Sequence, residues 1–419
     1  FSLILTVKMN SPMKNRLNYN MAKTETPNRY LDMVDHPAHV KKLTIKQLEY
    51  LAKELRQELI EGLAKHGGHL GPNLGVVELT VAMHKVFETP KDKFVWDVSH
   101  QSYVHKLLTG RKKQFRTIRT TEGLNGFSLR TESEHDCYGA GHAGTALSAA
   151  LGMAAARDQK GSKENIVCVF GDAALTNGCS FEALNNIAHT TKKFIGILND
   201  NEWSIAKNVG AISNYLNKLI TNPSYNKITN DLQKFLEKIP TGKLAVRLGL
   251  RGQEALKGTV TQAILEHNEE TMDADGRGGF GSSLIFEEFG IRYLGPIDGH
   301  DLPLIIETLE FAKSCEQPVV IHVITKKGKG FNAAVQHPEK FHGTGPYNPK
   351  SGESLPEKAD KPPKYQDVFG NTMVKICQKD KSVIGITAAM PSGTGLKTLE
   401  EKIPKQYYDV GIAEEHAVL

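Results

Sequence analysis

Apolar positions along the chain follow two spacings, one typical of helices and one typical of buried strands. Helical spacing covers about residues 43–65, and a Gly-rich loop then leads into a second helix at about 75–86. Continuous apolar runs, which are typical of buried strands, occupy 166–170 and 194–198, with a helical run at 181–189 between them. This alternation predicts an α/β fold, in which helices cover both faces of a parallel sheet.

The same patterns divide the chain into parts. Residues 1–28 are poor in acidic side chains, so we exclude them from the fold as a disordered or non-native leader, with a transit segment as the alternative. The α/β domain is predicted at 29–332, with a polar, Lys-rich excursion at 205–280. The Pro-rich stretch 333–364 is typical of a surface linker, and 365–419 begin a second α/β domain that we expect to be incomplete.

Composition narrows the class of protein. The chain is 39% hydrophobic and 24% charged, which is typical of a globular protein with a large core. Its formal net charge of +5 is small and spread out, so we expect no nucleic-acid partner. No apolar run reaches the roughly 18 residues of a membrane helix, so we expect no membrane partner. The cysteines lack CxxC spacing, which argues against a zinc site and favours the cytoplasm, or the plastid if the leader is a transit segment.

Oxygen-bearing side chains follow two of the predicted strands. Asp172 comes after the first, and Asn199-Asp200-Asn201 after the second. Ligands of such sheets bind beyond the carboxyl ends of the strands, and Mg²⁺ prefers oxygen ligands. We therefore predict that Asp172, Asn201 and the backbone carbonyl of Trp203 hold Mg²⁺. The alternative is that Asp172 caps the helix that starts near Gly178.

Small residues surround these strand ends. Ala173 and Ala174 allow backbone N–H groups to approach an anion, and the loop Gly141-His142-Ala143 opens a helix whose N-terminus favours negative charge. Together with the metal ligands, this favours a cofactor that carries a diphosphate. A nicotinamide enzyme is disfavoured because no GxGxxG follows the first strand.

The motifs carry a resemblance. "GDAALTNG" followed by "NDNEW" resembles the thiamine-diphosphate motif, and "GGHLGPNLGVVELTVAMHKVF", "FHGTGPYNP" and "VGIAEEHAV" are similar to 1-deoxy-D-xylulose-5-phosphate synthases over about residues 43–419. The resemblance implies a diphosphate-binding domain followed by a pyrimidine-binding domain, with thiamine diphosphate and Mg²⁺ as cofactors. It implies a homodimer that decarboxylates pyruvate and joins the two-carbon unit to glyceraldehyde 3-phosphate, the first step of non-mevalonate isoprenoid synthesis.

The resemblance also implies roles for single residues. The implied metal ligands are Asp172, Asn201 and Trp203. The implied cofactor-binding residues are His100, Gly141, His142, Ala143, Asp172, Ala173, Ala174, Asn201, Phe331 and Glu414. The implied catalytic residues are Glu414, which hydrogen-bonds the aminopyrimidine, and His69, His100 and His300, which transfer protons and bond developing alkoxides.

Three departures from the family pattern qualify these expectations. Ala173 stands where the motif has Gly, which predicts a backbone conformation that tolerates a Cβ atom. The loop 141–145 has one hydroxyl fewer than is common in the family. The family's sequence continues beyond Leu419, so we expect the chain as written to be inactive alone. The N-terminal subunit of a transketolase and a non-catalytic cofactor-binding fragment are the alternatives.

Overall fold

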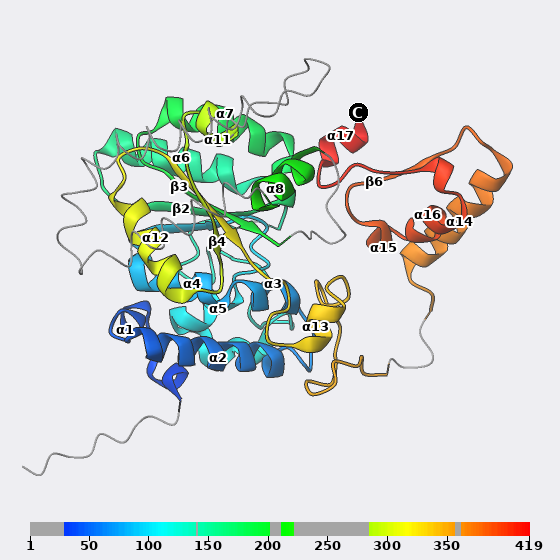
Figure 1. Cartoon of the computed structure of the whole chain (residues 1–419). Coiled ribbons are helices and arrows are strands. Elements are labelled where there is room, and N and C mark those ends of the chain that lie inside the picture. Colours follow the sequence, from blue (N-terminus) through cyan, green and yellow to red (C-terminus); the bar gives the residue numbers. More distant parts are fainter. Residues whose placement is uncertain (1–28, 140, 202–210, 222–284, 357–361) are drawn as a thin grey trace, which may run out of the picture.

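A parallel sheet of five strands lies at the centre of the larger part of the structure (Figure 1). The computed structural model describes residues 29–139, 141–201, 211–221, 285–356 and 362–419. The strands of this sheet are β1 Lys93–Trp96, β2 Ile166–Gly171, β3 Ile195–Asp200, β4 Arg292–Asp298 and β5 Val319–Ile324. Their order is β1-β2-β3-β5-β4, and every neighbouring pair is parallel.

The strand order reverses between β3 and β5. Strands β1 to β3 are added in one direction, after which the chain forms the edge strand β4 and returns with β5 to pair with β3. Thr325, directly after β5, donates its backbone N–H to the carbonyl oxygen of Asp200 at 2.8 Å. In open α/β sheets the ligand binds outside the carboxyl ends of the strands at such a reversal.

Helices cover both faces of the sheet, which confirms the predicted fold class. Alternate residues of β2 point to opposite faces, so Val167 and Val169 belong to one buried cluster, and Cys168 and Phe170 to another. One face is covered by α2 Ile45–Gly62, α4 Val77–Val86 and α12 Leu302–Ser314. The other is covered by α6 Ala146–Lys160, α7 Gly178–Thr190 and α11 Ile285–Glu288.

The N-terminal helices show why the predicted boundaries hold or shift. Helix α2 begins after Thr44, which forms a capping box with Gln47. The predicted Gly-rich loop contains a short helix, α3 Leu70–Gly75. Pro72 is tolerated there because it lies in the first turn, where its missing N–H is not needed. The helices η1 Tyr30–Met33 and α1 Pro37–Lys41 precede α2.

Shorter helices line the carboxyl side of the sheet. After β1 come α5 Tyr103–Lys106, the π-helical turn η2 Leu107–Arg111 and η3 Lys112–Thr117; after β2 comes η4 Ala173–Thr176, and after β5 comes α13 Asn332–Gln336. The predicted linker is partly packed, because Phe341 and Tyr347 are buried against Phe331. The predicted excursion lies largely outside the described residues, which include its helix α8 Ala211–Thr221.

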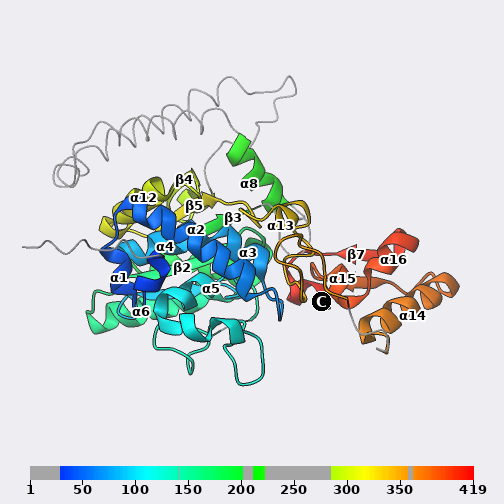
Figure 2. The ribbon, with the colours of Figure 1, turned by 90° about the horizontal axis from the view of Figure 1, so that it is seen from below.

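The C-terminal part lies beside the sheet domain (Figures 1 and 2). It contains α14 Tyr365–Lys379, β6 Gly385–Thr387, α15 Pro391–Thr394, α16 Lys397–Lys402, η5 Pro404–Gln406, β7 Tyr407–Asp409 and α17 Glu414–Val418. Strands β6 and β7 pair in parallel. The small core of this part includes Val374, Cys377, Leu396 and Leu399, while one side of α14 exposes Tyr365, Val368, Phe369 and Ile376. Among the described helices, none has the length and apolar character to cross a membrane.

Candidate functional site

Two carboxylates meet at the carboxyl ends of β2 and β3. The strands pair with Gly171 opposite Asn199, so the next residues along each strand, Asp172 and Asp200, are neighbours. Both are almost fully buried. The pKa of Asp172 is raised well above its usual value. Burial is the largest cause, and the charge of Asp200 and a hydrogen bond with it add to the effect. Like charges this close are stable only with a proton or a cation between them, so the donor set fits a divalent metal ion.

The structure decides against the capping alternative for Asp172. Helix α7 is capped by Asn177, whose side-chain oxygen accepts the backbone N–H of Cys179 at 2.9 Å. Asp172 makes no side-chain cap hydrogen bond to η4, the short helix that follows it. Ala173 lies inside η4 and has no positive φ, which confirms that this position tolerates a Cβ atom.

The predicted partners of Asp172 in metal binding are only partly described. Asn201 directly follows Asp200, whereas Trp203 lies outside the described residues. Joint ligation of Mg²⁺ by the three therefore stays a prediction. In the described part of the chain, no group of three or more His, Cys, Asp or Glu side chains is arranged to hold a metal, so the predicted set depends on amide and carbonyl oxygens as well.

A buried chain of hydrogen bonds supports Asp200 from β5 and β4. His322 donates from Nε2 to Asp200 Oδ2 at 2.9 Å, and its Nδ1 accepts from the hydroxyl of Tyr293 at 2.7 Å. His322 is completely buried. The sequence did not single out this histidine, because an imidazole in the middle of an apolar strand carries no local signal of its partner 122 residues away.

A buried lysine adds positive charge to the site. Lys327 follows β5, and burial lowers its pKa to about 8 although the negative charge of Asp172 acts in the opposite direction. Its Nζ lies 2.8 Å from Nδ1 of His342. Neither residue was predicted, although "TKKGKGF" and "FHGTGPYNP" were among the motifs that carry the resemblance. Once a cation neutralises the two carboxylates, this lysine charge favours an anionic ligand at this end of the sheet.

Three histidines are grouped beside this lysine. The rings of His69 and His100 lie edge to face with centroids 5.4 Å apart, and His342 stacks on His100 at 5.1 Å. Burial, with the charges of Arg119 and Lys327, lowers the pKa of His69 to about 4. Burial, with His342 and His69, lowers the pKa of His100 well below its usual value. Both imidazoles are therefore neutral at pH 7, so each can form hydrogen bonds as donor and as acceptor.

His300, the third predicted catalytic histidine, has different partners. Its Nδ1 donates to Glu78 Oε2 at 3.1 Å, and its Nε2 accepts the backbone N–H of Lys326 at 2.9 Å. Arg56 donates to the same Glu78 oxygen at 2.6 Å. With both ring nitrogens engaged, His300 is better suited to hold the loop before Lys327 than to exchange protons. Its catalytic role stays a prediction.

The predicted diphosphate loop is held by a buried carboxylate after β1. Asp97 accepts the backbone N–H groups of Gly144 and Ala146 at 3.1 and 3.2 Å, where α6 begins. These bonds orient the loop that carries Gly141, His142 and Ala143; His142 is exposed and the other two are partly exposed. Burial raises the pKa of Asp97 to about 6, and the charge of Glu414 acts in the same direction.

The last two predicted cofactor residues come from later in the chain. Glu414 is exposed at the start of α17, and this end of the chain contacts η4 and α7. Thr176 Oγ1 donates to the Ile412 carbonyl at 3.2 Å, and Asn177 donates to Glu415 at 3.4 Å. Phe331 is only 8% exposed. The structure thus brings Glu414 near the predicted diphosphate loop, while Phe331 packs into the core.

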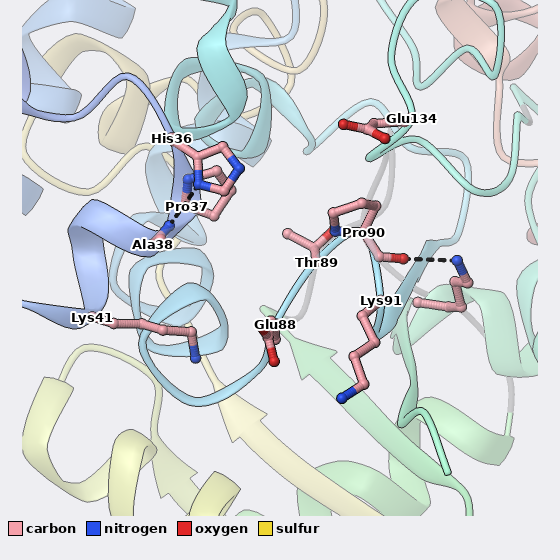
Figure 3. A pocket seen from close by; sticks show the side chains of 10 residues that line it. His36, Pro37, Ala38, Lys41, Glu88, Thr89, Pro90, Lys91 and Glu134 are labelled. Atoms are coloured by element: carbon pink, nitrogen blue, oxygen red, sulfur yellow. Dashed lines mark hydrogen bonds between the residues drawn. The ribbon is translucent and has the colours of Figure 1, made fainter. Parts of the chain in front are cut away.

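A separate cleft of about 520 Å³ opens near α1 (Figure 3). It is lined by His36, Pro37, Ala38, Lys41, Glu88, Thr89, Pro90, Lys91, Lys93 and Glu134. None of these is a candidate site residue. Lys41 donates to the backbone carbonyls of Lys85 and Val86, and Lys93 donates to that of Pro90. Two of the three lysines that line this cleft are therefore hydrogen-bonded to the backbone.

Comparisons with known proteins show which family the chain resembles. The family described as "1-deoxy-D-xylulose-5-phosphate synthase" matches residues 31–325, and "Transketolase, pyrimidine binding domain" matches 361–418. The synthase of Methylacidiphilum infernorum is 54% identical over 93% of this chain and 58% of its own length. That of Acidobacterium capsulatum is 51% identical with the same coverage. A solved transketolase from Campylobacter jejuni overlaps 90% of this chain and 62% of its own, with a TM-score of 0.48 and 16% identity.

The chain spans 58% of the length of these two curated relatives. The first family match alone covers most of the sheet domain, from before α2 to the residue after β5. The chain belongs to the 1-deoxy-D-xylulose-5-phosphate synthase family.

Proposed function

We propose that the protein carrying this chain is a 1-deoxy-D-xylulose-5-phosphate synthase that uses thiamine diphosphate and Mg²⁺. It decarboxylates pyruvate and transfers the two-carbon unit to D-glyceraldehyde 3-phosphate, the first step of the non-mevalonate isoprenoid pathway. The observation that supports this best is the buried pair Asp172–Asp200 at the strand reversal, close to Lys327, in a chain of this family.

Each part of the cofactor has candidate partners in the chain. Asp172, Asn201 and the Trp203 carbonyl would hold Mg²⁺, and Lys327 adds positive charge near Asp172. Gly141, His142, Ala143, Ala173 and Ala174 would line the diphosphate, with Phe331 beside the cofactor and Glu414 bonded to its aminopyrimidine. When bound, thiamine diphosphate supplies the carbon nucleophile and the electron sink for decarboxylation.

The histidines would handle protons in this reaction. His69 and His100 are neutral at pH 7, so each would donate a hydrogen bond at the reacting oxygen, and the proton transfer that the resemblance implies would be transient. His69 Nδ1 lies 3.1 Å from the Tyr103 hydroxyl, which orients the ring. His342, stacked on His100, is the third member of this group. His300 would hold the adjacent loop in place through its hydrogen bonds with Glu78 and the Lys326 backbone.

The reaction is tested by the fate of the pyruvate carboxyl group. The protein that carries this sequence, supplied with Mg²⁺ and thiamine diphosphate, is given 1-¹⁴C-pyruvate with glyceraldehyde 3-phosphate. We expect labelled CO₂ and one deoxyxylulose phosphate per CO₂. Two-carbon transfer between sugar phosphates without CO₂ would instead establish a transketolase, the alternative that the pyrimidine-domain match keeps open.

A non-catalytic fragment is the other alternative, and calorimetry on the chain as written addresses it. Tight, Mg²⁺-dependent binding of thiamine diphosphate by this chain alone would count against that alternative, while weak binding would favour it. A homodimer and a cytoplasmic location also stay proposals. Sedimentation tests the first, since a dimer doubles the chain's mass of 46.2 kDa.

A further inference from the structure

Asn73 connects the two loops that carry His69 and His100. Its side chain lies in α3 and is completely buried. The amide nitrogen donates to the carbonyl oxygens of both histidines at 2.7 Å each, and the amide oxygen accepts the backbone N–H of Tyr103 at 2.8 Å. Both amide hydrogens and one oxygen lone pair are thus used within the protein.

The loop with His100 needs such support, because its backbone is strained. Val98 and Ser99, between β1 and His100, have φ values of 58° and 68°, and this left-handed region is unfavourable for a β-branched residue. Strained turns persist where surrounding contacts fix them. Ser99 is fixed by bonds from Ser128 and Ser102, and the carbonyl of His100 by Asn73.

We propose that Asn73 is a positioning residue that sets the placement of the His69 and His100 rings relative to each other. Its two donated hydrogen bonds hold the backbone carbonyl groups of His69 and His100 close together. The imidazole rings of the same two residues are then placed for their edge-to-face contact. The structural claim stands on these bonds alone, whereas its consequence for turnover rests on the proposed function.

Asn73→Asp tests this role because it keeps size and shape. The carboxylate still accepts from Tyr103 but no longer donates, so it repels the two carbonyl oxygens. Asn73→Ser, which keeps one donor, is the milder variant. Asn165→Ala is the matched control: this asparagine is also buried, donates to Asp92 at 2.9 Å, and directly precedes β2, at the amino ends of the strands.

The direct readout is NMR of the histidine rings in protein labelled with ¹³C-histidine, assigned with His69→Gln and His100→Gln. We expect Asn73→Asp to shift the resonances of both rings and Asn73→Ser to shift them less. Asn165→Ala should lower the melting temperature but leave both resonances in place. Unchanged resonances in Asn73→Asp, or in Asn73→Ser if the first variant does not fold, would overturn the proposal.

Kinetics provide the second readout. If the protein is the proposed synthase, misplaced histidines slow the chemical step, so kcat should fall about tenfold to a hundredfold in Asn73→Asp while KM stays within about twofold. An unchanged kcat would contradict the positioning role. If no synthase activity exists in the wild type, the NMR result still stands, so failure of the proposed function and failure of this inference are distinguishable.

Discussion

Asp97 shows how burial sets the chemistry of a single residue. Its carboxylate accepts backbone N–H groups at the start of α6, which favours the charged form, yet burial is the larger effect and raises its pKa to about 6. A carboxyl group whose pKa is higher in the folded state binds protons more tightly there than in the unfolded chain. Asp97 therefore makes the free energy of unfolding fall as pH rises from about 4 to about 6.

Asp97→Asn removes this titration. Relative to the variant, the wild type should lose about 3 kcal/mol of unfolding free energy between pH 4 and 7, from a pKa raised by about two units. Urea unfolding of both proteins across this range measures the difference. A difference that does not change with pH would show that Asp97 titrates normally.

For single residues, the sequence predicts which side chains follow the ends of strands. It does not predict which side chains contact them from other strands. Asp172 and the two histidines His69 and His100 were found because they lie in motifs. Asp200 was noticed only as part of the second cluster, and His322 and Lys327 were missed, because their roles depend on contacts between strands that no local pattern encodes.

Glu78 joins three elements around the site. Burial alone would raise its pKa, but hydrogen bonds from His300 and Arg56 outweigh burial and lower the pKa to about 2. The carboxylate thereby ties α4 to α2 and to the loop before α12. A lowered pKa contributes stability that is present above the unfolded value of about 4.5 and lost as pH falls toward 2.

Glu78→Gln should remove this stabilisation. The wild type should exceed the variant by about 3 kcal/mol of unfolding free energy at pH 6, and the excess should shrink between pH 4.5 and 2. Glu49→Gln, on the exposed side of α2, is the control and should have little effect. An advantage of the wild type that persists undiminished at low pH would contradict the assignment.

The loop at Gly67 and Gly68 places His69 beside the segment that carries His342. Gly68 exchanges two backbone hydrogen bonds with Thr344, each 2.9 Å long. Gly67 has a φ of 75°, and a Cβ atom there would collide with the Thr344 carbonyl oxygen. Only glycine fits this close approach.

Gly67→Ala should therefore destabilise more than a change at another left-handed glycine. Gly161, at the end of α6, has a φ of 65° and open space around it, so Gly161→Ala should cost only the backbone strain of about 1 kcal/mol. We expect Gly67→Ala to cost roughly twice as much or more. Equal melting temperatures for the two variants would refute the close approach.

Elements with strong patterns were predicted well, and elements fixed by long-range contacts were not. Helix α2 has both apolar periodicity and a capping box, and its predicted range includes the observed one. Helix α3 was expected as a loop because three of its six residues are Gly or Pro. Its conformation depends on neighbours such as Phe341, whose carbonyl accepts the N–H of Gly71 at 2.7 Å.

For the whole molecule, the sequence predicted a parallel sheet but not its strand order. The reversal arises because β5 pairs with β3 on one side and with the edge strand β4 on the other. These pairings join segments far apart in the sequence, so no local pattern predicts them. That reversal brings Asp172, Asp200 and Lys327 to one place. The C-terminal part contacts the same region through Ile412 and Glu415. The candidate site is therefore assembled from segments across most of the chain.

Calorimetric titration of thiamine diphosphate, with and without Mg²⁺, tests most directly whether the ends of β2 and β3 hold a metal that anchors the diphosphate. We predict binding by the wild type that chelation of Mg²⁺ abolishes, and a loss of affinity of about a hundredfold or more in Asp172→Asn. Asp92→Asn, a change at a buried carboxylate at the amino ends of the strands, should keep Mg²⁺-dependent binding. Binding by Asp172→Asn as tight as that of the wild type would contradict the account.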